Sequence, residues 1–275
     1  MKKNAMPDLG LIIIGDEILS GKRTDKHLPK FIELLSARGL QLAYAEYVGD
    51  SPERITQVLQ RAFNSGHVLV SCGGIGATPD DHTRQCAAKA LGVPLALHPQ
   101  AKALIHERMR DTAQEQGVAF EPERHDNLHR LNMGTFPQGA SIILNPYNKI
   151  PGFSCAGAGQ GRVHFVPGFP VMAWPMMEAV LDDFCLHWGA APARVEKSII
   201  VFGAMEATLT PLMEAIEAAH AGVKVFSLPS VDHPQWGRHI ELGVKGEPGL
   251  ADQAYADLKD GLKAFKLEFG PEMVR

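Results

Sequence analysis

The feature that most constrains the fold is a repeated alternation of short apolar runs with segments of helical periodicity. Residues 11–14 predict a buried strand, and the apolar residues that follow at helical spacing are Leu28, Phe31, Ile32 and Leu35. Residues 41–48 and 67–72 predict two further strands, separated by a helix that Ser51-Pro52-Glu53 opens. Three β-α units within about ninety residues predict a mostly parallel sheet with helices on both faces, a three-layer α/β/α fold.

The rest of the chain divides into an extension of this fold and a second domain. Residues 99–130 are polar and helical, so we expect an excursion from the sheet, with later strands at 142–144 and 163–166 and a closing helix at 171–187. The Gly189-Ala-Ala-Pro-Ala193 segment predicts a boundary. We therefore expect one domain at residues 1–188 and a small α+β domain of β-α-β-β-α order at residues 194–275.

Composition excludes several classes of protein. The net charge is −4, and no dense run of Lys or Arg is present, so nucleic acid is not an expected partner. Four widely spaced cysteines form no CxxC pair, which argues against a zinc cluster and indicates a reducing compartment. The apolar stretch 9–14 is too short for a signal peptide or a membrane span. These features predict a cytoplasmic protein with no membrane association.

The strongest candidate site is the segment Ser71–Thr83, which leaves a strand and enters a helix. Its glycines would let the backbone approach a ligand closely, and amides at the helix start would face a phosphate. Thr78 is expected as the N-cap, Pro79 as the first helical residue, and Asp80 and Asp81 in the first turn. Two carboxylates beside a phosphate predict a bridging divalent metal such as Mg²⁺. The alternative is an ordinary glycine turn before a capped helix.

Acidic residues also follow the first two strands, as Gly15-Asp16-Glu17 and Gly49-Asp50. Parallel pairing would place them along one edge with Asp80 and Asp81. The proline-rich segments 145–152 and 167–170 are either ligand walls at this edge or simply rigid loops. His125 and His129 lack a third metal ligand, and 152–157 departs from the spacing of a nucleophile elbow with no strand leading into it, so neither predicts a site.

Taken together, four motifs resemble one family. They are Gly15–Gly21 with the sequence GDEILSG, Val48-Gly49-Asp50, Gly73–Gly76 followed by Asp80, Asp81 and Thr83, and Pro167–Pro170. This set resembles the molybdopterin-binding domain shared by MoaB/Mog-type proteins and by the N-terminal part of CinA, the competence/damage-inducible protein. The similarity covers about residues 8–180, and the opening and Asp-Asp-x-Thr motifs favour the CinA branch.

The resemblance implies a function and a set of residues. CinA-like domains are associated with metal-dependent hydrolysis of nucleotide diphosphates such as ADP-ribose or FAD, which releases AMP. Carried over by position, Asp81 and Asp50 are the catalytic acids, and Asp80 and Asp81 hold a divalent metal, Mg²⁺ or Co²⁺. The ligand, a nucleotide or molybdopterin, is expected at Gly15, Asp16, Glu17, Gly73, Gly74, Ile75, Gly76, Thr78, Thr83, Pro167 and Gly168. The family also implies a homo-oligomer such as a dimer.

The chain departs from the family pattern at three places. Thr24-Asp25-Lys26-His27 stands where the family has Asp-Thr-Asn, Pro146–Gly152 replaces a Pro-x-Gly-Thr-Ala-Pro-Gly turn, and no Glu follows Pro170. Two alternatives to hydrolysis therefore stay open. One is adenylyl transfer to molybdopterin, as in the Mog branch, and the other is a module that binds a pterin or nucleotide without catalysis. Residues 194–275 resemble the middle domain of CinA proteins in position, and deamidation is not predicted.

Overall fold

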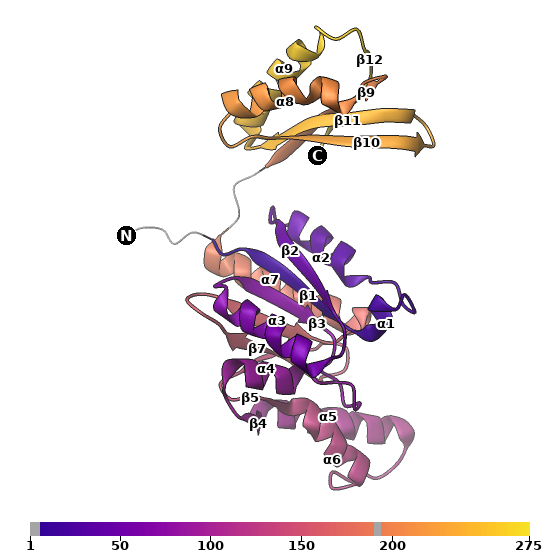
Figure 1. The fold of residues 1–275 in the computed structure, drawn as a ribbon. Coiled ribbons are helices and arrows are strands. Elements are labelled where there is room, and N and C mark those ends of the chain that lie inside the picture. Colours follow the sequence, from indigo (N-terminus) through magenta and orange to yellow (C-terminus); the bar gives the residue numbers. More distant parts are fainter. Residues whose placement is uncertain (1–5, 190–193) are drawn as a thin grey trace. The chain divides into compact units, whose positions relative to one another are not determined.

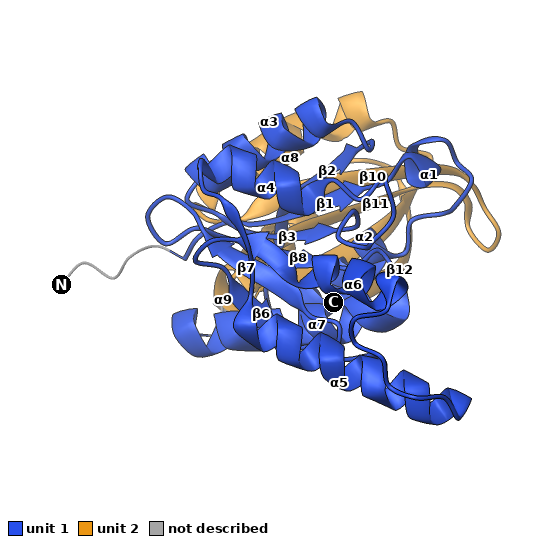
Figure 2. Cartoon of the chain, turned by 90° about the horizontal axis from the view of Figure 1, so that it is seen from below, with its two compact units in different colours: residues 1–190 blue, residues 191–275 orange. Residues whose placement is uncertain are grey.

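The computed structural model describes residues 6–189 and 194–275, which form two compact units (Figures 1 and 2). Unit 1 takes in the chain up to residue 189, and unit 2 begins at residue 194. The boundary expected at 189–193 lies almost entirely outside the described residues. We propose that the two units correspond to the domains expected at 1–188 and 194–275. Within the described parts, no helix has the length and apolar character needed to cross a membrane.

Unit 1 is built on a six-stranded sheet of order β2-β1-β3-β8-β7-β6. Its parallel strands are β2 (Leu42–Val48), β1 (Leu9–Ile14), β3 (Val68–Cys72) and β8 (Arg162–Val166). β7 (Gly152–Ala156) runs antiparallel to both of its neighbours, β8 and β6 (Ser141–Ile143). All residues of β1 and β3 are buried, as expected for central strands covered on both faces. The expected α/β fold with a mostly parallel sheet is confirmed.

Helices cover both faces of this sheet. α3 (Pro52–Asn64) and α4 (Thr83–Leu91) pack together on one face, while α2 (His27–Ser36) and α7 (Pro170–Trp188) pack together on the other (Figure 2). As predicted, Ser51 caps α3 and Pro52 is its first residue. Beneath α3 and α4, the rings of Phe136, Phe153 and Phe165 stack at centroid distances of 4.6 and 4.4 Å. This rigid core supports the strand ends that carry the candidate site.

The expected excursion lies between α4 and β6 (Figure 1). It holds a small antiparallel pair, β4 (Leu95–Leu97) with β5 (Thr135–Pro137), and the helical elements α5 (Pro99–Gln116), α6 (His125–Leu131) and η1 (Asn132–Gly134). The remaining element, α1 (Asp16–Leu19), is a single turn directly after β1. His125 and His129 both lie on α6, with ring centroids 4.5 Å apart.

Unit 2 is a four-stranded antiparallel sheet of order β10-β11-β9-β12 with two helices packed on one face. Its elements are β9 (Val195–Phe202), α8 (Glu206–Ala219), β10 (Lys224–His233), β11 (Gly237–Gly246), α9 (Pro248–Leu262) and β12 (Glu268–Val274). The predicted β-α-β-β-α order therefore omitted the last strand, β12, which the structure contains. β12 is an edge strand with mostly exposed residues, so its sequence carries little alternation of apolar and polar residues.

Two other expectations for unit 1 were wrong in detail. Ile32 is 45% exposed, and the inward face of α2 is formed by Phe31, Leu34 and Leu35 instead. Strands were predicted at 142–144 and 163–166 with none assigned between them, and β7 (Gly152–Ala156) forms there. Phe153 and Cys155 fill the core while Ser154 faces the other side, where its Oγ lies 2.7 Å from Nδ1 of His164. The preceding proline-rich segment masked this strand signal.

Candidate functional site

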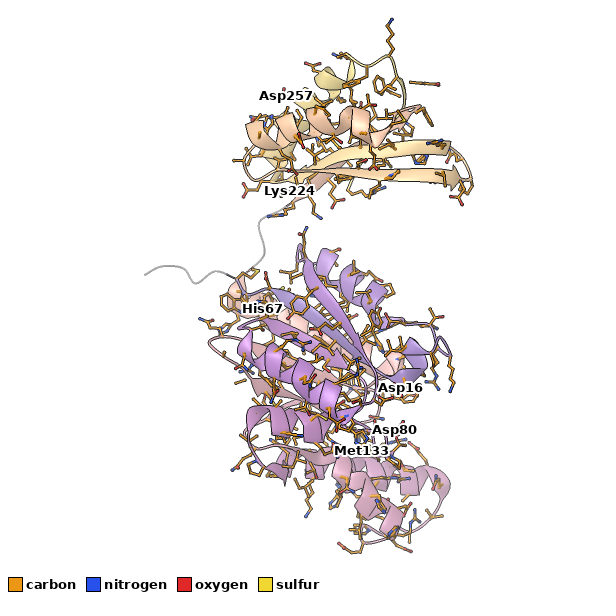
Figure 3. The ribbon with its side chains drawn as sticks, viewed as in Figure 1. Asp16, His67, Asp80, Met133, Lys224 and Asp257 are labelled. Carbon is orange, nitrogen blue, oxygen red and sulfur yellow. The ribbon has the colours of Figure 1, made fainter. Side chains whose placement is uncertain are left out.

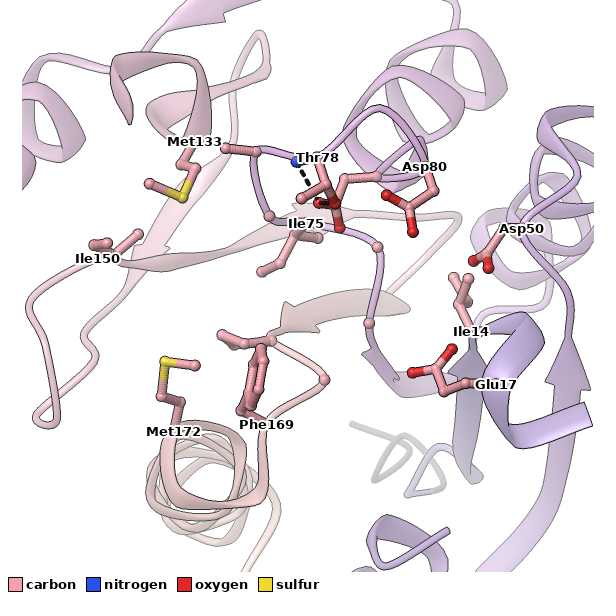
Figure 4. Close-up of a pocket in the computed structure, with 18 of the residues that line it drawn as sticks. Ile14, Glu17, Asp50, Ile75, Thr78, Asp80, Met133, Ile150, Phe169 and Met172 are labelled. Atoms are coloured by element: carbon pink, nitrogen blue, oxygen red, sulfur yellow. Dashed lines mark hydrogen bonds between the residues drawn. The ribbon is translucent and has the colours of Figure 1, made fainter. Parts of the chain in front are cut away.

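The parallel strands of unit 1 end at one edge, and the loops that follow them surround a cavity of about 740 Å³. Figure 3 shows Asp16, Asp80 and Met133 at this end of unit 1 and His67 at the opposite end. The polar and glycine residues that line the cavity are Gly15, Glu17, Lys22, Arg23, Asp50, Gly73, Gly74, Gly76, Thr78, Asp80, Asp81, Asn145, Asn148 and Gly168. The principal apolar ones are Ile14, Ile75, Met133, Ile150, Phe169 and Met172 (Figure 4).

The glycine loop, residues Gly73–Gly76, is anchored by hydrogen bonds from the first residues of α4. Oγ1 of Thr83 donates to the carbonyl of Gly73 at 3.1 Å, and the main-chain N–H of Thr83 donates to the carbonyl of Gly74 at 3.0 Å. The buried guanidinium of Arg84 donates to the carbonyl of Ile75 at 3.0 Å. Burial lowers the pKa of Arg84, and the nearby charge of Asp81 partly offsets this effect. Three consecutive carbonyls are therefore pulled toward α4.

This arrangement determines where the loop amides point. In a trans peptide the N–H points opposite to the carbonyl, so the amides of Gly74, Ile75 and Gly76 point away from α4. All three residues line the cavity, and none of these amides has a protein acceptor among the described residues. Successive amides turned to one side form a concave anion-binding site. The loop can therefore hold a phosphate or a carboxylate.

Only glycine fits at two positions of this loop. Gly73 has a φ of 102°, and a Cβ there would collide with the carbonyl oxygen of Ile14. Gly74 has a φ of 67°, and its Cβ would collide with Oγ1 of Thr83. Both conformations are strained for residues with a side chain. The glycines are thus required by the hydrogen bonds that orient the amides.

The acidic side of the cavity joins the loops after β1 and β2. The carboxylates of Asp16 and Asp50 each accept a hydrogen bond from the main-chain N–H of the other residue, at 3.2 and 2.9 Å. Burial raises the pKa of Asp50, and the charges of Asp16, Glu17 and Asp80 raise it further. This edge therefore carries unfavourable negative charge that a bound cation would relieve.

The turn between the glycine loop and α4 differs from expectation. α4 begins at Thr83 with His82 as its N-cap, so Thr78 is not a helix cap and Asp80 and Asp81 precede the helix. Oδ2 of Asp81 accepts hydrogen bonds from the main-chain N–H and the hydroxyl of Thr78. Such side-chain bonds to the backbone compete with helix formation, which explains the later start. The nearby Thr78 hydroxyl lowers the pKa of the exposed Asp80.

The structure places most of the expected site residues around this cavity. Thr83 is fully buried behind the glycine loop, and Asp16 lines adjoining hollows with Glu17, Asp50 and Asp80. Sequence reasoning missed Lys22, Arg23, Met133 and Met172. Lys22 and Arg23 follow the Gly15–Gly21 motif directly, which could have indicated them. Met133 comes from the excursion, and no local pattern marks it as a lining residue.

The rim segment 145–152 is an ordered wall of the cavity. Buried Asn145 donates through Nδ2 to Oδ1 of Asn148 and to the carbonyl of Ile150. Lys149 adopts a φ of 63°, and its ammonium contacts Glu107 and Asp111 of α5, at 2.6 Å from each. These two acids raise the pKa of Lys149. The loop is thus tied to the excursion on its outer side.

The donor types at the acidic edge suit a hard divalent cation, because carboxylate oxygens are the ligands that Mg²⁺ prefers. Asp50 and Asp81 each keep Oδ1 without a protein donor among the described residues. However, no three His, Cys, Asp or Glu side chains within 6–189 and 194–275 lie close enough together to hold a metal ion. The residues therefore fit a metal by chemistry and do not form a preassembled set of ligands.

Comparisons with known proteins give a consistent result. The family model described as "Probable molybdopterin binding domain" matches residues 10–187. A protein of Thermoplasma volcanium is 29% identical, with 94% of each chain covered. A CinA-like protein of Anaeromyxobacter dehalogenans is 30% identical over 78% of this chain, which spans only 50% of that relative's length.

A solved structure agrees with these relatives. The crystal structure of CinA from Thermoplasma acidophilum, described as a protein of unknown function, has a TM-score of 0.54 and 28% identity. The match covers 64% of this chain and 97% of that one. The resemblance inferred from the four sequence motifs is therefore confirmed. The chain belongs to the molybdopterin-binding domain family, as a CinA-like member.

Proposed function

We propose that the chain binds a nucleotide or pterin phosphate at the glycine loop and hydrolyses a nucleotide diphosphate of the ADP-ribose or FAD type to AMP. The observation that carries this proposal is the placement of three amides, from Gly74 to Gly76, in the same cavity as Glu17, Asp50 and Asp80. An amide cradle binds phosphate, and acids beside it serve proton transfer or metal binding.

Each group in the cavity has a proposed role. The loop amides hold phosphate oxygens, and Lys22 and Arg23 add positive charge, since neither has a carboxylate partner within the described parts of the chain. Asp81 and Asp50 are the proposed essential acids, and Asp80 with Asp81 is the proposed metal-ligand pair. A bound Mg²⁺ or Co²⁺ would neutralise charge between these carboxylates and the phosphates.

Asp50 is the proposed general base. Its raised pKa makes it a better proton acceptor than an ordinary carboxylate, and its Oδ1 is free to accept. Water attacks one phosphorus of the diphosphate and loses its proton to Asp50, while the bridging P–O bond breaks. From ADP-ribose the products are AMP and ribose 5-phosphate.

One observation favours a second candidate, binding without catalysis. Oδ2 of Asp81 already accepts two hydrogen bonds from Thr78, and the described residues contain no group of three side chains placed to hold a metal ion. A binding module with an amide cradle would need neither feature. Ligand-dependent stabilisation without product would support this candidate.

The test is to incubate the purified protein with ADP-ribose and FAD in the presence of magnesium, cobalt or EDTA, and to follow AMP by chromatography. We expect metal-dependent AMP release that Asp81→Asn and Asp50→Asn abolish. Thermal melts of both variants with and without ligand show whether the fold and the cradle are retained. No AMP from either substrate, with ligand stabilisation intact, would reject hydrolysis and leave the binding module or an adenylyltransferase, which molybdopterin and ATP would then distinguish.

We also propose a homo-oligomer such as a dimer, on the basis of the family resemblance alone, and a cytoplasmic location, on the basis of the widely spaced cysteines. Light scattering at several protein concentrations tests the oligomeric state. A mass of one chain throughout would exclude the dimer.

A further inference from the structure

The cavity differs in character between its two ends. Figure 4 shows Glu17, Asp50 and Asp80 at one end of the cavity and an apolar wall at the other end. The glycine loop passes between the two ends. That wall consists of Ile75, Met133, Ile150, Phe169 and Met172. A ligand that fills the whole cavity must therefore present phosphates to one end and an apolar body to the other.

Phe169 is the only ring among these five side chains, and it is 57% exposed despite its size. It is the residue before α7, in extended conformation. Its loop is fixed, because Nε2 of the buried His27 donates to the carbonyl of Gly168 at 3.0 Å. A large aromatic side chain held open to solvent beside a cavity is suited to stacking on a flat ring.

The side-chain amide of Asn148, which lines the cavity, makes hydrogen bonds within the protein. Oδ1 of Asn148 accepts hydrogen bonds from Nδ2 of Asn145 and from the main-chain N–H of Ile150. Nδ2 of Asn148 donates to Sδ of Met172 at 3.2 Å. The methionine thioethers add polarizable surface that favours contact with aromatic rings. Selection at this end therefore depends on stacking and shape more than on hydrogen bonds.

We propose that the apolar end binds the flat heteroaromatic ring of the ligand by stacking on Phe169, and that Phe169 determines the preference for ring-bearing phosphates. This inference rests on the proposed function, because it assumes that the phosphates occupy the amides of Gly74 to Gly76. Adenine, flavin and pterin rings share the required chemistry. Phosphates without a ring leave the apolar wall exposed to water.

The test uses isothermal titration calorimetry on the full chain with AMP, FMN and inorganic pyrophosphate as probes. Phe169→Ala should weaken AMP and FMN binding at least about tenfold, the usual size of a lost stacking contact, and leave pyrophosphate binding unchanged. Phe169→Trp should retain ring binding. The matched control is Tyr147→Ala, because Tyr147 is an aromatic residue of the rim segment that is 61% exposed and does not line the cavity.

The outcomes separate the two proposals. Unchanged AMP and FMN affinity in Phe169→Ala, or an equal loss of pyrophosphate binding, would overturn the ring site. Pyrophosphate binding without tighter binding of any ring-bearing probe would overturn the ring site and keep the phosphate site. Ring binding that depends on Phe169, with no AMP released from ADP-ribose, would uphold the ring site and reject hydrolysis. Binding of no probe would reject both.

Discussion

Asp16 and Asp50 exchange main-chain hydrogen bonds across two loops. The N–H of Asp16 donates to Oδ2 of Asp50 at 2.9 Å, and the N–H of Asp50 donates to Oδ1 of Asp16 at 3.2 Å. The loop after β1 is thereby joined to the loop after β2, with Gly49 in close contact because a Cβ there would collide with Oδ1 of Asp16. The pair fixes the acidic edge of the cavity and brings two negative charges together.

Asp50→Asn should stabilise the protein while abolishing its proposed activity. Asn keeps an oxygen that accepts from Asp16, and it removes the charge that burial and three neighbouring acids disfavour. A raised pKa means that the contribution of Asp50 to the free energy of unfolding is most favourable below the ordinary Asp pKa and is lost as pH rises through the raised value. We expect a gain below about 1 kcal/mol at pH 7, because solvent screens this half-exposed group.

Urea unfolding of this variant at pH 7 and pH 3 provides the measurement. The gain should disappear at pH 3, where the wild-type carboxyl is protonated. A variant that is less stable than wild type at pH 7 would show that the Asp16–Asp50 bonds outweigh the charge repulsion.

Gly74→Ala should destabilise the chain more than a glycine substitution of similar backbone conformation elsewhere. Gly74 and Gly92 have φ values of 67° and 69°, but only at Gly74 does a Cβ meet another atom, Oγ1 of Thr83. We expect a loss of about 1 kcal/mol for Gly92→Ala and at least about 2 kcal/mol for Gly74→Ala, by chemical denaturation. Equal losses would mean that the contact with Thr83 is easily relieved.

Thr83→Val tests the anchoring of the glycine loop. The change keeps the shape of a fully buried side chain but leaves the carbonyl of Gly73 without its donor. A loss of about 1–3 kcal/mol in the free energy of unfolding is expected, with weaker ligand binding. Thr83→Ser retains the hydroxyl and should lose less ligand affinity than Thr83→Val. If both variants bind ligand like wild type, the hydroxyl does not position the loop.

His164 should make unit 1 sensitive to acid through a residue that does not line the cavity. Burial lowers its pKa from 6.5 to about 3, and Ser154 supplies its hydrogen-bond partner. A depressed pKa gives stability that is complete above about pH 6.5 and is lost as pH falls toward 3, by up to about 1.4 kcal/mol per pH unit. His164→Gln keeps an acceptor for Ser154 but cannot titrate.

The comparison is urea unfolding of wild type and His164→Gln at pH 7.5 and pH 5. From pH 7.5 to pH 5, the free energy of unfolding of His164→Gln should fall less than that of wild type. A parallel fall in both proteins would assign the acid sensitivity to other groups.

Sequence patterns predicted the parts of the fold that local physics determines. Buried strands such as Leu9–Ile14 are continuous apolar runs, and Ser51-Pro52 marks a helix start by capping chemistry. The predicted start of α4 was wrong because the hydrogen bonds between Asp81 and Thr78 replace the expected helix cap. Both arrangements satisfy the polar groups, and which one forms depends on the loop that the hydrogen bond between Thr83 and Gly74 closes. β12 was missed because an exposed edge strand needs no apolar face.

The sequence likewise predicted one part of the candidate site and missed another. The glycine loop and the acids after β1 and β2 follow from motif and topology, since parallel strands end at one edge. The apolar wall does not, because Met133 reaches the cavity from the excursion and Met172 from the first turn of α7. Only tertiary packing brings these distant residues together.

The most direct measurement is a ¹⁵N–¹H spectrum of the protein, labelled at glycine and isoleucine, titrated with ADP-ribose under conditions where binding is also measured by calorimetry. We predict that the amide signals of Gly74, Ile75 and Gly76 shift with ligand to saturation, because these N–H groups donate to phosphate oxygens, and that Gly92, at the far end of α4, stays unchanged. Measured binding with no shift at Gly74, Ile75 or Gly76 would contradict the phosphate site on which the account depends.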